Sequence, residues 1–437
     1  MNLFYTIALF AQIIYVYDVM GNSYILFISV LLTPAYVFIN ILKRRDYYMS
    51  VFKNKFFILL SVLCVCIGLA RSNHPTAEMY WSIIKAFQLL CLFLASGIFI
   101  ESNKNNFNKI LSTTLMPFVI ICILNVVLWL VNFKPPKMEE AFTSQAVLVS
   151  IFGINLDRAS FPFGFGINNY SMLTGSLFII SIIALVKLNK NKLLYAISVA
   201  FSAISLILID TRATIISAIL LIIFLLFIRK TSKIKFIKFL PYITIVGPLL
   251  YVSIIPLLAS LDLSSLLVRD NEDMSNGNSR FLIWGIAVQE LSNFKLEHLI
   301  GYGEYGHYES GASKMWSDIF SVVEKSEIKS PHNTVLSIIF DYGYFGLILY
   351  IYFWRDIVNR IKIIWNSNQE IALIFIGFYC YNIIVSISEA SFGMYAAQFN
   401  YLFFIITHYL YEISNTISNP IRYHSIVKWK NQTLATA

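Results

Sequence analysis

The chain has unusually little charge. Only 13% of its 437 residues are Asp, Glu, Lys or Arg, whereas 58% are hydrophobic and the mean hydropathy is +0.69. A soluble domain carries about 25% charged residues, so this chain cannot cover a water-exposed surface in the usual way. The composition excludes an ordinary soluble domain and predicts an integral membrane protein.

Cysteines are few, and none lies in a polar segment. All five fall inside apolar runs, at Cys64, Cys66, Cys91, Cys122 and Cys380. A disulfide framework needs cysteines in exposed loops, so these thiols are predicted to be small core residues.

A concentrated basic patch is also missing, although the net charge is +9. Nucleic-acid binding requires Lys and Arg gathered on one soluble face, whereas here they occur in short runs between apolar segments. This distribution argues against a nucleic-acid partner and is typical of residues that set membrane topology.

Long apolar runs are what the sequence does have. A helix needs about 20 apolar residues to cross a bilayer, which predicts an all-α membrane protein, a single polytopic domain over residues 1–437 with about twelve spans. The start of the chain lacks a basic segment and a cleavage site, so its first run is predicted to be a retained span. The spans are predicted near residues 2–19, 23–42, 56–70, 80–100, 109–132, 169–186, 193–210, 213–228, 237–259, 334–354, 370–388 and 394–412.

The basic residues orient these spans. Every even connection is basic, as in Lys43-Arg44-Arg45, whereas the short odd connections hold almost no basic residue except Arg71 and Arg212. By the positive-inside rule both termini are predicted to be cytoplasmic. Two long segments, 133–168 and 260–333, then lie outside, and the second is predicted to be the main catalytic loop because long exposed loops commonly carry function.

Arg212 is the most unusual single residue, because it stands at a tight outer corner between two apolar spans. A guanidinium offers a planar fork of donors that suits phosphate oxygens, and its place at headgroup depth favours an anionic partner. A local pair with Asp210, or a contact with lipid phosphate, explains the same position equally well.

Arg280 follows Ser279, a favourable N-cap, at the start of a predicted helix in which Phe281, Trp284, Val288 and Leu291 recur at helical spacing. The first turn of a helix favours an anion. The alternative is an arginine exposed on an amphipathic surface helix.

His332 lies in Pro331-His332-Asn333, directly before the tenth span, where Asn333 is predicted to cap the helix. This helix is predicted to start along the surface and to turn inward at Gly343 and Gly346. A histidine at the membrane surface suits a general base for a sugar hydroxyl, although a solitary histidine is more often structural.

Two further patterns are weaker evidence for a functional site. Gly301 to Gly306 matches G-x-G-x-x-G, but a dinucleotide site needs a βαβ unit, so this segment is predicted to be a flexible turn. His298, His307 and His332 have no metal-site spacing, and the outer loops hold no Asp-x-Asp pair. No metal and no cofactor are therefore predicted.

The order of these motifs resembles the bacterial O-antigen polymerase and O-antigen ligase superfamily. The pieces that carry the resemblance are Asp157-Arg158 with Phe163 to Asn169, Thr211 to Thr214, Ser279-Arg280 with Trp284, Gly301-Tyr302-Gly303, and Pro331-His332-Asn333 followed by Asp341 to Gly346. The R-x₁₀-G repeats described for some polymerases are missing from the outer loops.

The resemblance implies the fold of glycosyltransferases that use lipid-linked sugars (GT-C-like), in the bacterial inner membrane with a periplasmic site. It implies a metal-independent, inverting transfer of a glycan from undecaprenyl diphosphate. Arg212 and Arg280 would hold the diphosphate and His332 would orient or deprotonate the acceptor. Arg158, Asn333 and Trp284 are candidate substrate contacts.

Three functions remain open at this point. A polymerase would join one lipid-linked repeat unit to another, with a chain-length regulator as a candidate partner. A ligase would transfer the same donor glycan to lipid A–core. A flippase or transporter would need polar residues through a central cavity. The charges within the predicted spans are few and lie mostly toward the outer side: Asp18, Lys85, Asp341, and Glu389 near an outer end.

Overall fold

The computed structural model describes the greater part of the chain. The described residues are 2–15, 23–43, 77–103, 106–134, 157–164, 167–227, 237–239, 242–243, 245–247, 250, 280–303, 305–317, 330–392 and 398–418. Every regular element in these ranges is a helix, and none of them is a β-strand. The predicted span at 56–70, and most of the one at 237–259, lie outside the described residues.

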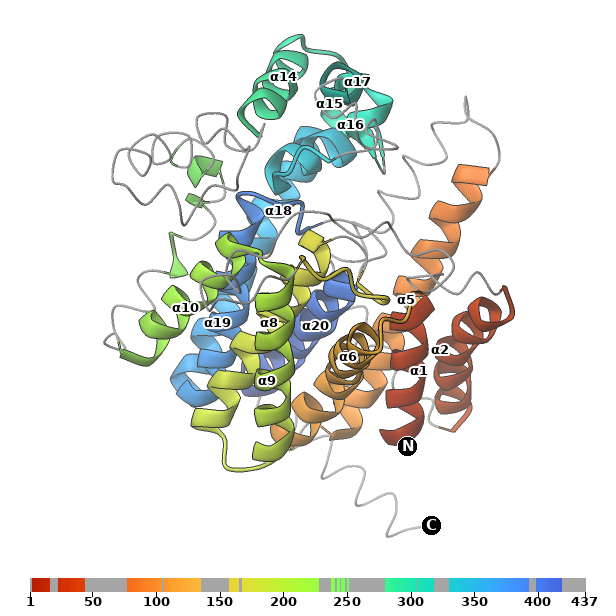
Figure 1. The fold of residues 1–437 in the computed structure, drawn as a ribbon, viewed down its shortest axis with the longest axis vertical. Helices are drawn as coiled ribbons and strands as arrows, with labels where there is room; N and C mark the ends of the chain where they lie inside the picture. The colour runs from red at the N-terminus through yellow and green to blue at the C-terminus, as the bar shows by residue number, and fades with distance from the viewer. Residues whose placement is uncertain are drawn as a thin grey trace.

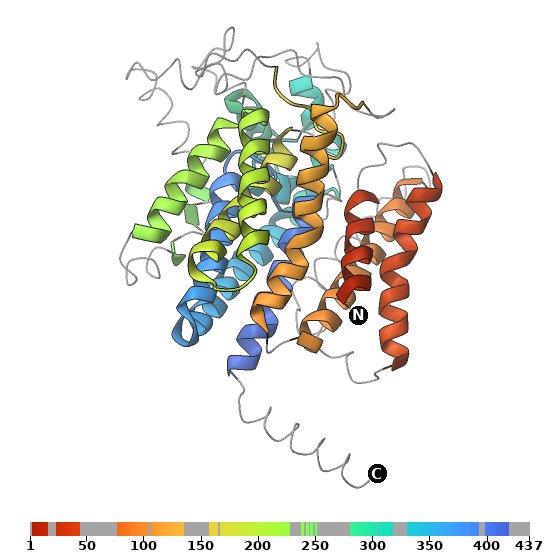
Figure 2. The same cartoon turned by 60° about the horizontal axis from the view of Figure 1, so that its bottom comes forward.

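Nine of the described helices build the body of the molecule together with α18 (Figure 1). They are α1 (Asn2–Tyr15), α2 (Ser23–Lys43), α5 (Ala77–Asn103), α6 (Phe107–Leu130), α8 (Ile167–Lys187), α9 (Lys192–Ile209), α10 (Arg212–Phe227), α19 (Gln369–Ser386) and α20 (Gln398–Ser418). Helices α1, α2 and α5 lie side by side at one flank (Figure 2).

Length and composition make five described helices able to cross a membrane: α6, α8, α9, α18 and α19. Shorter apolar helices occupy parts of α1, α2, α5 and α10. Large apolar side chains also point outward, with Leu220 62% and Phe227 80% exposed, as lipid-facing residues do. The chain is therefore an all-α, membrane-embedded protein, and the prediction of about twelve spans stays a prediction.

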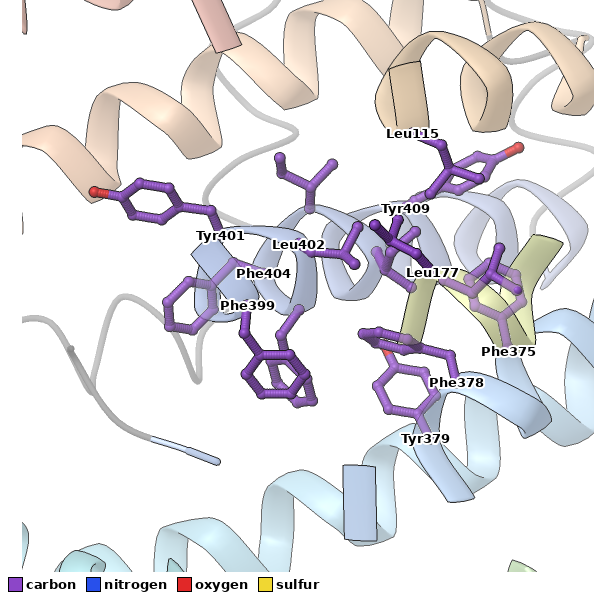
Figure 3. Close-up of a cluster of buried hydrophobic side chains, with 14 of the residues drawn as sticks. Leu115, Leu177, Phe375, Phe378, Tyr379, Phe399, Tyr401, Leu402, Phe404 and Tyr409 are labelled. Atoms are coloured by element: carbon purple, nitrogen blue, oxygen red, sulfur yellow. The ribbon is translucent and has the colours of Figure 1, made fainter. Parts of the chain in front are cut away.

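An aromatic core holds α6, α8, α19 and α20 together. Figure 3 shows Phe378 and Tyr379 of α19 turned toward α20, whose Phe404 and Tyr409 lie in the same cluster, with Leu177 of α8 beside them. These side chains are almost fully buried. The predicted core cysteines Cys91, Cys122 and Cys380 are buried and free, and the other two lie outside the described residues.

The tenth predicted span is a bent helix, α18 (Thr334–Ser367), with a break at Gly343. Gly343 has φ 69° and ψ −172°, a conformation that is essentially restricted to glycine. The predicted change of direction at this residue is confirmed. The part before the break carries the residues that follow His332, and the longer part after it runs into the helical body.

Four short helices, α14 (Arg280–Ser292), α15 (Glu297–Ile300), α16 (Gly306–Glu309) and α17 (Ala312–Ser317), gather over the first part of α18 at one end of the molecule (Figure 1). Helices α14 and α17 form a second small core with α18, in which Trp284 and Trp316 pack against Phe340. The long loop predicted to be catalytic is thus partly a folded cap.

The glycine-rich segment is docked onto the break in α18 and is not a loose turn. The Tyr302 and Gly303 backbone N–H groups donate to the carbonyls of Phe340 and Asp341 at 2.7 and 2.9 Å. The Gly306 N–H donates to the Asp341 carboxylate at 2.8 Å. These bonds satisfy carbonyl groups that the break removes from the helical pattern, so the glycines serve backbone packing.

We expect Gly343→Ala to destabilise the fold by about 3 kcal/mol, because its positive φ disfavours a side chain. A Cβ there would also lie 2.4 Å from the Leu299 carbonyl. Gly285→Ala is the matched control, because a Cβ at Gly285 meets nothing within 4 Å and alanine favours the α14 helix by about 0.5–1 kcal/mol. Equal thermal unfolding temperatures of the two purified variants would contradict this assignment.

Candidate active site

Glu389, three residues after the end of α19, joins two of the predicted catalytic residues. Its Oε1 accepts a hydrogen bond from Arg280 Nη2 at 2.7 Å, and its Oε2 lies 3.1 Å from His332 Nδ1. The side chains of Arg280, Glu389 and His332 are 18%, 12% and 23% exposed. They are shielded enough to interact strongly, and each is still partly open to solvent or to a substrate.

The first turn of α14 positions Arg280. The helix buries Ile283, Trp284, Ala287 and Leu291, while Val288, which the helical spacing placed on the same face, is 57% exposed. The prediction of a helix here is confirmed, but its buried face is rotated toward Ile283 and Ala287. Ser279, the predicted N-cap, lies outside the described residues.

His332 sits in a turn that is fixed on both sides. Its φ is 46°, in the left-handed region. Before it, the Pro331 carbonyl accepts a hydrogen bond from Trp284 Nε1 at 2.9 Å. After it, Asn333 caps α18 as predicted, because its Oδ1 accepts from the Leu336 N–H at 3.0 Å. Asn333 Nδ2 donates to the Ile387 carbonyl at 2.9 Å.

A further contact ties this turn to the segment that carries Glu389. Thr334 Oγ1 donates to the Glu389 carbonyl at 2.7 Å and also lies 3.0 Å from Ser391 Oγ. The segments that carry the imidazole and the carboxylate are therefore held together by side-chain hydrogen bonds of Asn333 and Thr334 as well as by the contact between His332 and Glu389.

The environment of Glu389 favours its charged form. Burial by itself raises the pKa of the carboxyl group, but the neighbouring His332 and Arg280 and a hydrogen bond from Asn168 outweigh it, so the pKa lies below its ordinary value of 4.5. Near neutral pH the group is thus a carboxylate. A neutral imidazole that faces a carboxylate through Nδ1 must carry its proton on that nitrogen, which leaves the Nε2 lone pair as the base.

Arg212 and Arg158 both contact the corner between α9 and α10. Asp210 ends α9 with φ 55°, and its carboxylate lies 3.7 Å from Arg212 Nε. Arg158 Nε donates to the Ile209 carbonyl at 2.8 Å. Arg212 and Arg158 are each 8% exposed. The local pair of Arg212 with Asp210, one of the two alternatives for this residue, is present.

The corner and the Glu389 cluster lie at the same end of α8. Thr214, two residues after Arg212, lies 3.4 Å from Ser171 Oγ, which donates to the Asn168 carbonyl at 2.8 Å. The Asn168 side chain in turn hydrogen-bonds Glu389. Ser171 and Asn168 are about one turn of α8 apart, which is about 5.4 Å of rise. The corner that carries Arg212 and the cluster that carries Arg280 are thus connected through the same turn of one helix.

The six predicted site residues therefore fall into three positions. Arg280 and His332 share one carboxylate, Arg212 and Arg158 share the α9–α10 corner, and Trp284 and Asn333 use their side-chain polar atoms to hold the His332 turn. Sequence reasoning gave Glu389 no role beyond a charge near the outer end of a span. An acidic residue at such a position was the available signal, because charges near the bilayer are costly unless they are paired.

This geometry suits base-assisted transfer to a hydroxyl group. An imidazole oriented by a carboxylate can accept a proton and be stabilised as imidazolium. Arginines at the same end of the bundle can contact an anionic leaving group. The fold and these groups together describe a membrane-embedded, all-α protein with a polar site at one end of its helices.

Comparison with known families agrees with this description. A family model described as O-antigen ligase matches residues 197–351, a range that includes Arg212, Arg280 and His332 but neither Arg158 nor Glu389. The match covers about a third of the chain and supports the resemblance to the O-antigen polymerase and ligase superfamily that the motifs indicated. No protein with a curated description matches the chain in sequence. The family indicates a glycosyltransferase-like enzyme of polysaccharide or lipopolysaccharide assembly.

Proposed function

We propose that the protein is a polysaccharide polymerase that transfers a glycan from undecaprenyl diphosphate to a sugar hydroxyl of another lipid-linked repeat unit. The observation that carries this proposal is the arrangement of Arg280 and His332 on the two oxygens of Glu389. It provides a base for the acceptor and a cation for the leaving group within one cluster. The site would face the periplasm from the bacterial inner membrane, with both termini in the cytoplasm.

In this mechanism His332 Nε2 takes the proton of the acceptor hydroxyl as the oxygen forms a bond to the anomeric carbon of the donor. The bond between that carbon and the phosphate oxygen breaks, and its electron pair leaves with the lipid diphosphate. The proton rests on the imidazole, where the Nδ1–H bond to Glu389 stabilises the imidazolium. The step needs neither an oxidant nor a metal to balance.

The arginines would stabilise the charge that grows on the diphosphate. A guanidinium carries five N–H donors, so Arg280 can contact Glu389 and a phosphate together. Arg212, at the N-terminus of α10, would contribute both its charge and the positive end of the helix dipole. Arg158 would contact the glycan or a phosphate, whereas Trp284 and Asn333 would hold the His332 turn in place.

A ligase is the second candidate function, and the description of the matching family favours it. Donor, base and cations would be the same, and only the acceptor would differ, being lipid A–core in place of a second repeat unit. Deleting the gene and separating the lipopolysaccharides on a gel distinguishes the two. A polymerase deletion retains core bearing a single repeat unit, whereas a ligase deletion leaves core without any repeat. An unchanged ladder of chain lengths would contradict both.

We expect Glu389→Gln to slow glycan transfer about 100-fold, because general-base catalysis contributes about 10²- to 10⁴-fold and an amide cannot stabilise the imidazolium. Because the pKa of Glu389 is depressed, its carboxylate persists as pH falls until that lowered pKa is reached. The transfer rates of the native protein and the variant should therefore be compared at about pH 8, where the Glu389 carboxylate is fully present and an ordinary imidazole is neutral.

The matched control is Glu297→Gln, which removes an exposed carboxylate of the same cap. Its transfer rate should equal that of the native protein. If the Glu389→Gln variant retained the full native transfer rate at about pH 8, Glu389 would not orient the base.

A further inference from the structure

A polar cavity lies on the long part of α18, away from the candidate active site. Its volume is about 720 Å³, and its lining includes Lys238, Tyr242, Tyr352, Arg355, Asn359 and Lys362. Four of these residues are on α18 at positions that recur every three or four residues, and so they share one face of the helix.

This cavity is positively charged. Lys238, Arg355 and Lys362 line it, and none of the described Asp or Glu residues does. The only polar contact among the described residues for these cations is that of Lys362 Nζ with Asn359 Oδ1, at 3.5 Å. Three cations around one space repel one another unless an anion lies between them, so the lining favours an anionic ligand.

Arg360, another arginine of α18, has an acidic partner and an aromatic partner among the described residues, unlike the cations that line the cavity. Arg360 Nε donates to Asp356 at 2.8 Å, and its guanidinium stacks 3.6 Å from the ring centroid of Tyr411. That cation is neutralised and packed inside the protein. Arg355 and Lys362 are on another face of the same helix, and Lys238 comes from a separate segment. None of the three has such a partner in the described part of the chain.

The position of the cavity points to a lipid. Arg355 and Lys362 follow Gly343 along the same helix, so they lie about 18 and 28 Å beyond the break at 1.5 Å per residue. The hydrocarbon core is about 30 Å thick, which puts the cavity near the membrane face opposite His332. Tyr242 and Tyr352 are 63% and 55% exposed beside it, as tyrosines at a membrane interface are.

We infer that this cavity, lined by Lys238, Arg355 and Lys362, binds the phosphate headgroup of an anionic phospholipid from the leaflet opposite the candidate active site. The basic residues would contact the phosphate, and the exposed tyrosines would lie along the glycerol and the first part of the acyl chains. A basic pocket between membrane helices is a common way to hold such a headgroup. This site is independent of the proposed glycan transfer.

The test compares lipid binding by the purified full-length protein with that of a triple variant, Lys238→Gln with Arg355→Gln and Lys362→Gln. Native mass spectrometry would measure retention of added phosphatidylglycerol, with phosphatidylcholine as the neutral lipid. Each basic contact strengthens anionic-lipid binding by about fivefold, so the triple variant should bind phosphatidylglycerol about 100-fold more weakly. The single variant Arg355→Gln should bind phosphatidylglycerol about fivefold more weakly than the native protein. It replaces the triple variant in this test if the triple variant does not fold.

The matched control removes three charges from the α8–α9 connection at the same end of the bundle, by Lys187→Gln, Lys190→Gln and Lys192→Gln. It should bind phosphatidylglycerol as the native protein does. An equal loss in this control, or equal binding of phosphatidylcholine by the native protein, would overturn the proposal. So would inorganic phosphate that displaces the lipid at micromolar concentration, because the site would then be one for free phosphate.

Discussion

Replacing His332 by Asn is expected to abolish formation of long glycan chains while leaving the protein folded in the membrane. Loss of a general base lowers a transfer rate by about 10²- to 10⁴-fold. Asparagine is the informative substitution, because His332 has a φ of 46° and Asn tolerates the left-handed region better than other residues. The measurement is the rate of transfer from a purified lipid-linked repeat unit, together with the lipopolysaccharide ladder in cells.

The control for this experiment is the stability of the same variant. Thermal unfolding of His332→Asn should match that of the native protein, because the contacts of Pro331, Asn333 and Thr334 on either side remain. His332→Ala should lose the same activity but some stability as well, since alanine in the left-handed region costs about 1–2 kcal/mol. A well-folded His332→Asn variant with native ladders would remove the imidazole from the mechanism.

Replacing Arg280 by Lys is expected to lower the transfer rate about 100-fold, because removing one positioned donor to a developing negative charge costs about 10²- to 10³-fold. Lysine keeps the charge beside Glu389 but is a compact ammonium without the planar fork that binds a phosphate through two bonds. The loss should appear mainly in kcat, since the charge on the diphosphate grows in the transition state.

Lys295→Ala is the matched control for Arg280. Lys295 is 45% exposed and pairs with Glu290 on the same cap, and exposed pairs of this kind contribute little. Its transfer rate should be native. Arg280→Ala should be at least as slow as Arg280→Lys. Native kcat in Arg280→Lys would mean that the guanidinium acts only as a structural partner of Glu389.

The sequence predicted the local structure that carries Arg280 and His332 but not the carboxylate that both of them contact. Helical spacing predicted α14, and Asn333 was recognised as a cap because a side-chain acceptor directly before an apolar run suits a helix start. The break at Gly343 could also be predicted from glycine within a helical run. The rotation of α14 could not, because its apolar residues cover more than one face and Val288 is as hydrophobic as Ile283.

Composition and pattern determined by themselves that this chain is a helical membrane protein, and ordered short motifs indicated the superfamily that the family match supports. These are local properties, because hydrophobicity and capping are read from neighbouring residues. Only the tertiary structure decided that Glu389 joins His332, 57 residues earlier, to Arg280, 109 residues earlier. A hydrophobic period tells which face of a helix is buried but not which distant residue it meets, so the pairing of charges emerges only when the helices pack.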